Sequence, residues 1–273
     1  MAAVADPRFR RDLYRGTARY YDRFRRPYPA ELTGDLVRRC RADGEGRLAD
    51  LACGTGQLAF ALRRGFAEVW AVDREPGMVE VVREKASLAG VGGIRAVAAD
   101  AEDADLPEAS FDLIVIGNAF HRLDRRAVAA NVFRWLRPGG HLALVWSDPP
   151  WLGDEPWQRA LAALLDRWQV RAGAADRIPA GWDVGRAARP DAVVLAEAGL
   201  RPAGRREFPQ RCEWTVAELA GLAYSTSFLS REALGDLAPD FEADLRAGLS
   251  SFAVAGPLAQ RSHAAYELAF RRS

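Results

Sequence analysis

A glycine-rich run is the segment of this sequence whose residue types and spacing could bind a charged ligand. Residues 50–57 read Asp-Leu-Ala-Cys-Gly-Thr-Gly-Gln and lie between an apolar stretch and a segment with helical periodicity. At Gly54 and Gly56 the backbone can turn sharply and approach a ligand where a β-carbon would collide. The glycines alone leave the kind of ligand open, because an ordinary tight turn uses them as well.

Two cofactors fit this run. Residues 54–59 match the Gly-x-Gly-x-x-Ala form of the dinucleotide fingerprint, and Asp73 lies at the spacing where an acid holds a ribose. Asp50, however, lies four residues before Gly54. A carboxylate there repels a pyrophosphate but attracts the ammonium and sulfonium charges of S-adenosylmethionine. The acid therefore favours S-adenosylmethionine, and a dinucleotide oxidoreductase that binds NADH is the competing hypothesis.

Further polar residues come where apolar runs end. Asp73 and Asp100 close two such runs, and Asn118 follows a third. If the runs are parallel strands, these residues share one edge of the sheet with Asp50, which is the edge where open α/β sheets bind ligands. We expect Asp100 or its neighbours to meet an adenine amino group and Asn118 to face the same opening.

The elements that must position these residues alternate between strand and helix. Short apolar runs bounded by turn residues predict buried strands, and apolar residues at helical spacing predict helices between them. The predicted strands are 47–53, 68–73, 94–100, 111–117 and, after a turn at 137–140, 141–146; the helices are 58–64, 76–87 and 125–136. Such alternation predicts a doubly wound sheet with right-handed crossovers.

Three parts are expected: an N-terminal helical lid at 1–35, a core at 36–147, and a substrate cap with further strands at 148–273. Prolines at 27 and 29 end the first part, and Pro149 and Pro150 break the chain after the core. Beyond it we expect a helix at 155–171, loops at 172–189, a strand at 201–212 and a helix capped by Thr215 and Glu218. Alternation at 266, 268 and 270 predicts a final edge strand.

The motifs resemble, in order and spacing, those of the class I S-adenosylmethionine-dependent methyltransferase family. They are Asp-x-x-Cys-Gly-Thr-Gly at 50–56, Ala-Val-Asp at 71–73, Ala-Asp-Ala at 99–101, Phe-Asp-Leu-Ile at 111–114 and Leu-Arg-Pro-Gly-Gly at 136–140, so the resemblance covers about 47–146. It implies a mostly parallel seven-stranded Rossmann-like sheet with a helical cap inserted after strand five. It also implies S-adenosylmethionine as cofactor and S-adenosylhomocysteine as product.

The resemblance further implies which residues hold the cofactor. Residues 52–54 and 56 would line the methionine and ribose portion, Asp73 would take the ribose hydroxyls, and residues 100 and 101 would flank the adenine. Alanine at 52 departs from the glycine that this family often has. The full set of candidates is Tyr21, Arg26, Asp50, Ala52, Cys53, Gly54, Gly56, Gln57, Asp73, Arg74, Met78, Asp100, Ala101, Glu102, Asn118 and Ala119.

A subgroup that acts on small molecules is similar over more of the chain. Tyr21, the Arg-Pro-Tyr-Pro run at 26–29, Ala-Phe-His at 119–121, the segment 151–168 and Tyr-Ser-Thr-Ser at 224–227 carry this resemblance. Tryptophan is commoner in that subgroup where Arg122 stands, so its acceptor chemistry does not transfer. Candidates for acceptor binding are Tyr14, Tyr28, His121, Trp146, Trp151 and Tyr224.

His121 is the candidate catalytic residue. A histidine after the fourth strand would lie near the transferred methyl, and its ordinary pKa suits proton removal from an acceptor hydroxyl or amine. The alternative is that it only packs against, or donates a hydrogen bond to, the surroundings of the cofactor. Trp157 and Trp168 could join Trp146 and Trp151 in an aromatic acceptor pocket, or could be core residues.

Composition limits the other classes of function. A formal net charge of +1 in 273 residues does not favour polyanion binding. Arginines and aromatics alternate over 8–28, which suits either nucleic acid or, more simply, an amphipathic lid. Three separated cysteines predict neither disulfides nor a metal pair, and the histidines lack metal-ligand spacing. Without a signal peptide or an apolar run of about 18 residues, we expect a cytoplasmic monomer or homodimer.

The expected function is methyl transfer to an oxygen or nitrogen of a small molecule in specialised, natural-product metabolism. An RNA- or protein-directed methyltransferase would share the core, and the same fold can also serve as a non-methylating cyclase or scaffold.

Overall fold

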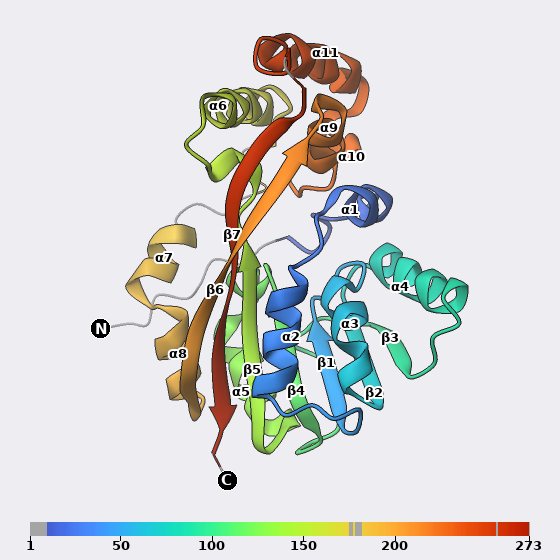
Figure 1. Cartoon of the computed structure of the whole chain (residues 1–273), viewed down its shortest axis with the longest axis vertical. Helices are drawn as coiled ribbons and strands as arrows, with labels where there is room; N and C mark the ends of the chain where they lie inside the picture. Colours follow the sequence, from blue (N-terminus) through green and yellow to red (C-terminus); the bar gives the residue numbers. More distant parts are fainter. Residues whose placement is uncertain (1–9, 175–176, 178–181, 255, 273) are drawn as a thin grey trace.

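The computed structural model describes residues 10–174, 177, 182–254 and 256–272, and Arg8 of the arginine-rich segment lies outside them. A seven-stranded sheet runs through the molecule in the order β3-β2-β1-β4-β5-β7-β6 (Figure 1). The strands are β1 (Arg47–Leu51), β2 (Glu68–Asp73), β3 (Ile94–Ala98), β4 (Phe111–Gly117), β5 (Leu136–Ser147), β6 (Leu200–Trp214) and β7 (Leu258–Arg271). The first five are parallel and β7 is antiparallel to both neighbours, so the predicted mostly parallel Rossmann-like sheet is confirmed.

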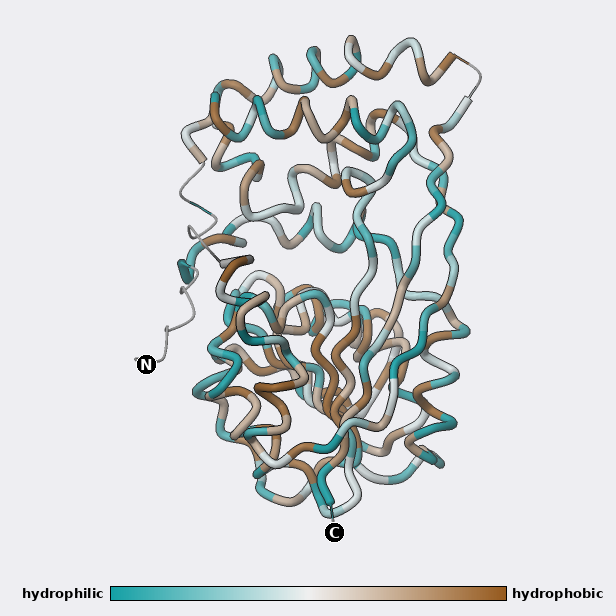
Figure 2. Tube along the Cα trace, turned by 90° about the vertical axis from the view of Figure 1, so that its left-hand side faces the viewer, coloured by the Kyte–Doolittle hydropathy of each residue, from teal (hydrophilic) through white to brown (hydrophobic). Residues whose placement is uncertain are grey.

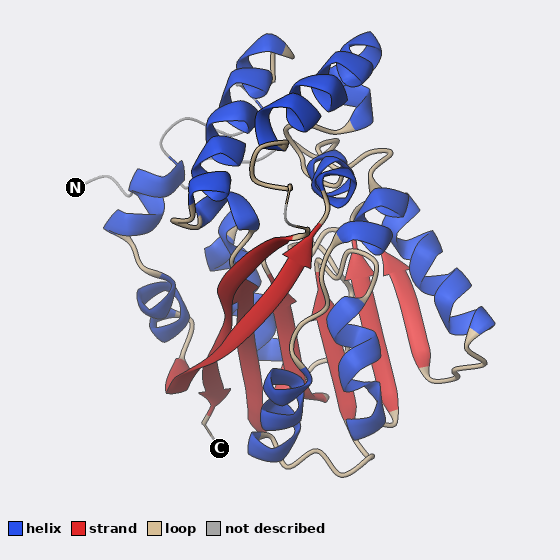
Figure 3. Ribbon diagram, turned by 45° about the horizontal axis from the view of Figure 1, so that its top comes forward, coloured by secondary structure: helices blue, strands red, loops and turns tan. Residues whose placement is uncertain are grey.

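Helices cover both faces of the sheet because its inner strands are apolar on both sides (Figure 3). On one face lie α2 (Ala30–Arg39), α3 (Gln57–Leu62) and α4 (Pro76–Leu88), and Leu32, Leu36 and Leu58 pack against β1 and β4. On the other face lie α5 (Arg125–Trp135) and α8 (Asp191–Glu197). The strands form the brown, apolar bundle of Figure 2. The boundary expected at residue 35 falls inside α2, whose leucines belong to the core of the sheet.

A second apolar layer stands above the carboxyl ends of the strands. It contains α6 (Pro156–Arg171), α9 (Val216–Tyr224), α10 (Arg231–Leu234) and α11 (Ala238–Leu249), and α1 (Ala18–Phe24) packs against α9. The expected cap on α9 is present: Glu218 N donates to Thr215 Oγ1 over 3.1 Å, and Thr215 N donates to Glu218 Oε2 over 2.8 Å. Figure 1 shows β6 and β7 rising from the sheet to these helices. Cap helices therefore follow both β5 and β6.

Several predicted boundaries were wrong. The strand expected at 47–53 ends at Leu51 because Ala52 has a φ of 51°, and the strand expected at 94–100 ends at Ala98. Residues 137–140 belong to β5 and not to a separate turn. Opposite them the pairing with β4 shifts between Phe111 and Leu113, and Gly139 has a φ of 80°. A positive φ is compatible with a bulge that keeps the strand continuous.

Two predictions beyond the core also need correction. The final strand is not at the edge: β7 lies between β5 and β6, and β6 forms the edge. The segment expected to be loops over 172–189 contains the helix α7 (Trp182–Ala188), while residues 175–176 and 178–181 of that prediction lie outside the described part of the chain.

Candidate active site

The glycine-rich run forms a loop of left-handed backbone between β1 and α3. Ala52, Gly54 and Gly56 have φ values of 51°, 55° and 80°. Cys53 N donates to Val72 O over 3.0 Å, which ties the loop to the neighbouring strand. A β-carbon at Gly54 would lie 3.1 Å from the Tyr21 ring, so glycine is required there by close packing as well as by φ. Alanine at 52, the departure from the family pattern, occupies a conformation that glycine would adopt without strain.

Asp73, at the end of β2, holds this loop. One carboxylate oxygen accepts a hydrogen bond from Gly54 N (2.7 Å) and the other accepts one from Glu75 N (2.9 Å). Each oxygen keeps a further lone pair, and the side chain reaches a cavity beside the loop. Burial raises its pKa despite these backbone donors. Asp73 can therefore shape the loop and still accept hydrogen bonds from a ligand.

Asp50 lies behind the loop, not on its open side. Its carboxylate is 1% exposed and accepts a hydrogen bond from Ala59 N in α3 over 2.9 Å. Burial raises its pKa to about 7. The expectation of direct contact with a ligand ammonium is not supported by this placement, since the carboxylate fixes the junction of loop and helix and can attract a cation only from a distance.

A small cavity of about 90 Å³, called here the loop cavity, lies above the loop. The N-terminal segment before α1 closes it from the other side with Leu13 and Tyr14. Nine of the residues predicted to hold a cofactor line it: Tyr21, Ala52, Gly54, Asp73, Arg74, Met78, Ala101, Asn118 and Ala119. The structure thus brings together residues that the sequence separates by as much as 98 positions, as the predicted topology requires.

The other predicted cofactor residues do not line the loop cavity. Asp100 forms ion pairs with Arg74 (2.5 Å) and Arg11 (3.0 Å), and Glu102 accepts a hydrogen bond from Asp124 N (2.9 Å). Cys53 is buried, and a β-carbon at Gly56 would lie 3.2 Å from Phe60 and Val82, so this glycine serves packing. Arg26 and Gln57 line a second cavity instead.

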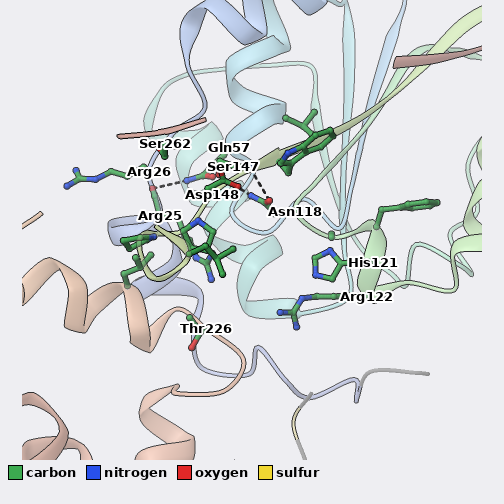
Figure 4. Close-up of a pocket in the computed structure, with 18 of the residues that line it drawn as sticks. Arg25, Arg26, Gln57, Asn118, His121, Arg122, Ser147, Asp148, Thr226 and Ser262 are labelled. Atoms are coloured by element: carbon green, nitrogen blue, oxygen red, sulfur yellow. Dashed lines mark hydrogen bonds between the residues drawn. The ribbon is translucent and has the colours of Figure 1, made fainter. Parts of the chain in front are cut away.

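This second cavity, called here the cap cavity, has a volume of about 610 Å³ and lies between the sheet and the cap (Figure 4). Three of the residues predicted to bind an acceptor line it beside His121: Tyr14, Trp146 and Trp151. In Figure 4, His121 and Arg122 lie on one side of the cavity, and Arg25 and Arg26 lie on the other. Its volume and mixed aromatic and polar wall suit a small organic molecule.

The two cavities share part of their walls. Tyr14, Tyr21, Asn118, Ala119 and Arg122 line both, so they surround the place where one cavity meets the other. Asn118 has a φ of 51°, which asparagine tolerates. Its Nδ2 lies 3.1 Å from the Tyr28 hydroxyl and 3.3 Å from Ser147 Oγ, while its Oδ1 accepts a hydrogen bond from Ser147 N (3.2 Å). A well-anchored amide therefore stands at the junction.

His121 lies in the 3-10 helix Phe120–Arg122, on the wall of the cap cavity next to this junction. Burial, followed by the positive charges of Arg122 and Arg186, lowers its pKa to about 3. The imidazole is neutral at physiological pH but binds protons weakly. The sequence argument relied on an ordinary pKa near the operating pH, and in this respect it was wrong.

Two predicted acceptor residues lie elsewhere. Tyr28 packs among the core residues of the sheet and contacts Asn118 through its hydroxyl, so it positions a junction residue. Tyr224 is 4% exposed in the core of the cap and donates to Glu242 Oε1 over 2.7 Å. Trp157 and Trp168 are buried in the same core. Helix α9 ends at Tyr224, and the following residues Thr226 and Ser227 face the cavity instead.

Sequence reasoning missed several residues of the cap cavity. Arg25, Asp148 and Trp214 line it, as do Thr226 and Ser227. Asp148 directly follows β5, so the rule that polar residues after strands face the ligand could have found it. Arg25 and Trp214 have no comparable sequence signal. Arg25 follows α1 and Trp214 ends β6, and only the tertiary fold brings both to the same cavity.

Comparison with known proteins adds family evidence to this geometry. Residues 49–144 match the family model described as a methyltransferase domain. Over these residues, about a third of its length, the chain is similar to the methyltransferase family. An uncharacterised methyltransferase of Mycobacterium tuberculosis is 34% identical over 149 residues, which is 54% of this chain and 56% of that protein. The demethylmenaquinone methyltransferase of Thermus thermophilus is 36% identical over 38% of this chain and 48% of its own length.

Solved structures resemble the chain over more of its length. A protein of Anaeromyxobacter dehalogenans, described as a type II methyltransferase, has a TM-score of 0.55 at 23% identity and covers 91% of this chain and 98% of its own. A [4+2]-cyclase has a TM-score of 0.54 at 18% identity and covers 91% of this chain and 84% of its own. At these identities the likeness concerns the fold. The sequence match spans only about half the length of the first curated relatives.

Two other observations on the described residues concern metals and membranes. Within the described ranges, no group of three or more histidine, cysteine or acidic side chains is arranged to hold a metal ion. In the same part of the chain, no helix has the length and apolar composition needed to cross a bilayer.

Proposed function

We propose that the protein transfers a methyl group from S-adenosylmethionine to an oxygen or nitrogen atom of a small molecule in specialised metabolism. The observation that carries this proposal is the pair of adjoining cavities. One is bounded by the glycine loop and Asp73, the other has the size of a small-molecule site, and Asn118 and Ala119 line both. A donor in the first and an acceptor in the second would meet at these residues.

The residues of the loop cavity fit the proposed cofactor. Asp73 keeps lone pairs for two ribose hydroxyls, and Met78 and Ala101 offer an apolar wall for a purine. The left-handed backbone at Ala52 and Gly54 leaves one side of the loop open to a methionine portion. The cavity measures about 90 Å³, and Leu13 and Tyr14 of the N-terminal segment form part of its wall.

The chemistry asks little of the protein beyond placement. A methyl group on a sulfonium is already activated, so rate enhancement comes from aligning the acceptor atom with it and from excluding water. Tyr14, Tyr21 and the rest of the N-terminal segment cover the junction for this purpose. Neutral His121 offers one hydrogen-bond donor and one hydrogen-bond acceptor, so it can orient an acceptor molecule without removing a proton from it.

Calorimetric titration tests the cofactor part of the proposal. Wild-type protein and the Asp73→Ala variant are titrated with S-adenosylmethionine, S-adenosylhomocysteine and NADH. We expect the two adenosyl ligands to bind the wild type, to bind the variant more weakly, and NADH not to bind. Binding of NADH alone would contradict the proposal and indicate redox chemistry.

Product analysis tests the transfer itself. Acceptor-dependent release of S-adenosylhomocysteine, with a methylated product in the mass spectrum, is the expected result. A rearranged product without release of S-adenosylhomocysteine would indicate a non-methylating cyclase. An acceptor that proves to be RNA, with affinity falling steeply as salt rises, would indicate a nucleic-acid methyltransferase.

A further inference from the structure

Two arginines of the cap cavity are attached to the same short loop of the cap. Arg25 donates from Nε to Ser225 Oγ (2.9 Å) and from a terminal nitrogen to Ser225 O (3.3 Å), while Arg122 donates to Ser227 Oγ (3.2 Å). Thr226, between these serines, faces the cavity. The two guanidinium groups therefore flank one patch of the wall, and Arg122 also lies at the junction of the two cavities.

Arg25 has no carboxylate partner among the described residues. Its guanidinium group lies 4.9 Å from the centre of the Tyr21 ring and is only partly buried. It uses two donor groups on Ser225, which leaves donors of its five N–H groups for a ligand. A fixed, uncompensated guanidinium on a cavity wall is suited to a carboxylate, which it can bind through two parallel hydrogen bonds.

Most carboxylates of the cavity, in contrast, are already paired. Asp191 lies 2.8 Å from Arg125 and 2.7 Å from Arg186, and Glu267 lies 3.8 Å from Arg205. Among the described lining residues there are five arginines and three carboxylates, but Arg26 also pairs with Glu218 (3.1 Å) and Arg205 with Glu207 (2.6 Å), both outside the lining. Asp148 is the third carboxylate, and it is exposed after the end of β5. Its charge would favour a cationic acceptor instead.

We propose that the methyl acceptor is an organic carboxylate on a partly apolar molecule, bound in the cap cavity by Arg25, with Arg122 on the opposite side of the cavity. This rests on the proposed methyltransferase function and specifies its substrate class. A lone pair of the carboxylate oxygen forms the new O–C bond while the C–S bond of the donor breaks and its electron pair stays on sulfur. The products are a methyl ester and a neutral thioether, and no proton is gained or lost.

This chemistry agrees with the surroundings of His121. An amine or alcohol must lose a proton during methylation, but a carboxylate is already ionised at neutral pH. Burial and nearby arginines hold the pKa of His121 far below neutrality, so it binds protons too weakly to serve such an acceptor well. The aromatic walls at Trp151 and Phe228, whose ring centres lie 6.1 Å apart, offer the apolar contact for the remainder of the molecule.

Matched ligand pairs test the proposal without knowledge of the natural acceptor. The protein is saturated with S-adenosylhomocysteine and titrated with cinnamate against cinnamamide and octanoate against octanamide, followed by calorimetry and by the fluorescence of the cavity tryptophans. We expect at least one acid to bind ten or more times more tightly than its amide. The methyl ester of that acid should form when the protein is given S-adenosylmethionine in place of S-adenosylhomocysteine.

Variants assign this preference to particular residues. Arg25→Gln should abolish most of the preference for the acid, and Arg25→Lys, which keeps the charge, should retain part of it. Asp148→Asn should strengthen acid binding because it removes a repulsive charge. Arg23→Gln is the matched control, since Arg23 lies on the same helix but packs over Phe24 away from the cavity.

The outcomes separate this proposal from the one on which it rests. Three results would overturn the carboxylate assignment in a protein that still binds S-adenosylhomocysteine. They are equal affinity for acid and amide, tighter binding of cinnamylamine than of cinnamate, and no binding of any acid. Failure of the wild type to bind S-adenosylhomocysteine overturns the proposed function instead.

Discussion

The loop cavity and the cap cavity differ in how their walls are assembled. The loop cavity is built mainly from residues 52–123, at the ends of β1 to β4, with the N-terminal segment laid across it. The walls of the cap cavity come from α1, from the segments after β4 and β5, from β6 and β7, and from the loop after α9. One cavity follows from the winding of the sheet, whereas the other depends on how separate segments pack.

This difference separates the two proposed binding sites. A strand–loop–helix unit fixes its own geometry, so the ligand of the loop cavity is constrained by local backbone conformation. The cap cavity can change its lining where α1 or the loop after α9 changes, because these segments lie outside the sheet. We therefore expect substitutions in the two regions to have separable effects on the cofactor and on the acceptor.

The largest expected effect is on the loop cavity. Asp73→Ala removes the oxygens that would accept hydrogen bonds from two ribose hydroxyls, each contributing about 1.5–3 kcal/mol to binding, together with the bonds from Gly54 N and Glu75 N that hold the loop. We expect the affinity for S-adenosylhomocysteine, measured by calorimetry, to fall about 100-fold or more. Asp43→Ala is the control, because Asp43 also accepts a hydrogen bond from a loop amide (3.1 Å) but lies on an exposed turn. Equal losses in both variants would show that the effect is only on folding.

The pH dependence of stability should have opposite signs in the two regions. Asp50, behind the loop cavity, has a pKa raised to about 7 from 3.8, so its contribution to stability declines as the pH rises between these values. His121, on the cap cavity, has a pKa lowered to about 3 from 6.5, so stability is lost as the pH falls below 6.5. Each slope can reach about 1.4 kcal/mol per pH unit.

Denaturant unfolding from pH 4 to 8 measures these slopes. Relative to wild type, Asp50→Asn should become progressively more stable towards pH 7, and His121→Gln should become progressively more stable towards pH 4. Parallel curves for wild type and either variant would contradict the environment assigned to that residue.

Two tyrosine substitutions sharpen the comparison further. Tyr224→Phe removes a hydrogen bond to Glu242 inside the cap and should lower the free energy of unfolding by about 1–2 kcal/mol, without changing ligand affinity. Tyr28→Phe removes the contact with Asn118 at the junction and should weaken S-adenosylhomocysteine binding a few-fold. A change in acceptor affinity in Tyr224→Phe would restore the role predicted for this residue from sequence.

The smallest expected effect comes from the backbone of the loop. Ala52→Gly relieves a left-handed conformation and should raise the free energy of unfolding by about 0.5–1 kcal/mol, after the entropy cost of glycine. Ala109→Gly is the matched control, because Ala109 has a φ of 48° in an exposed turn. Both should stabilise the protein, but only the change at 52 should alter cofactor affinity.

The sequence was most informative where a local pattern determines the geometry. Gly54, Asp73 and Asn118 were placed on a common edge because parallel strands align their carboxyl ends. Asp50 was predicted at the same edge but is buried, since the pattern does not say whether the side chain points to the ligand or to the following helix. Tyr224 and Arg25 could not be assigned, because their positions depend on the packing of α1 against α9, 190 or more residues apart in the chain.

The interior position of β7 has a consequence for how the chain folds during synthesis. Leu142 in β5 pairs with Ala269, and Arg201 in β6 pairs with Phe270, so β6 joins the sheet only through the last strand to be made. While residues 148–257 leave the ribosome, β6 has no partner in the sheet, and α9 to α11 have no fixed position above it. The first five strands can pair before that, because their contacts are complete once Ser147 has emerged. We therefore expect the cofactor half to form first on the ribosome, and the acceptor half only when the chain has been synthesised as far as Arg271.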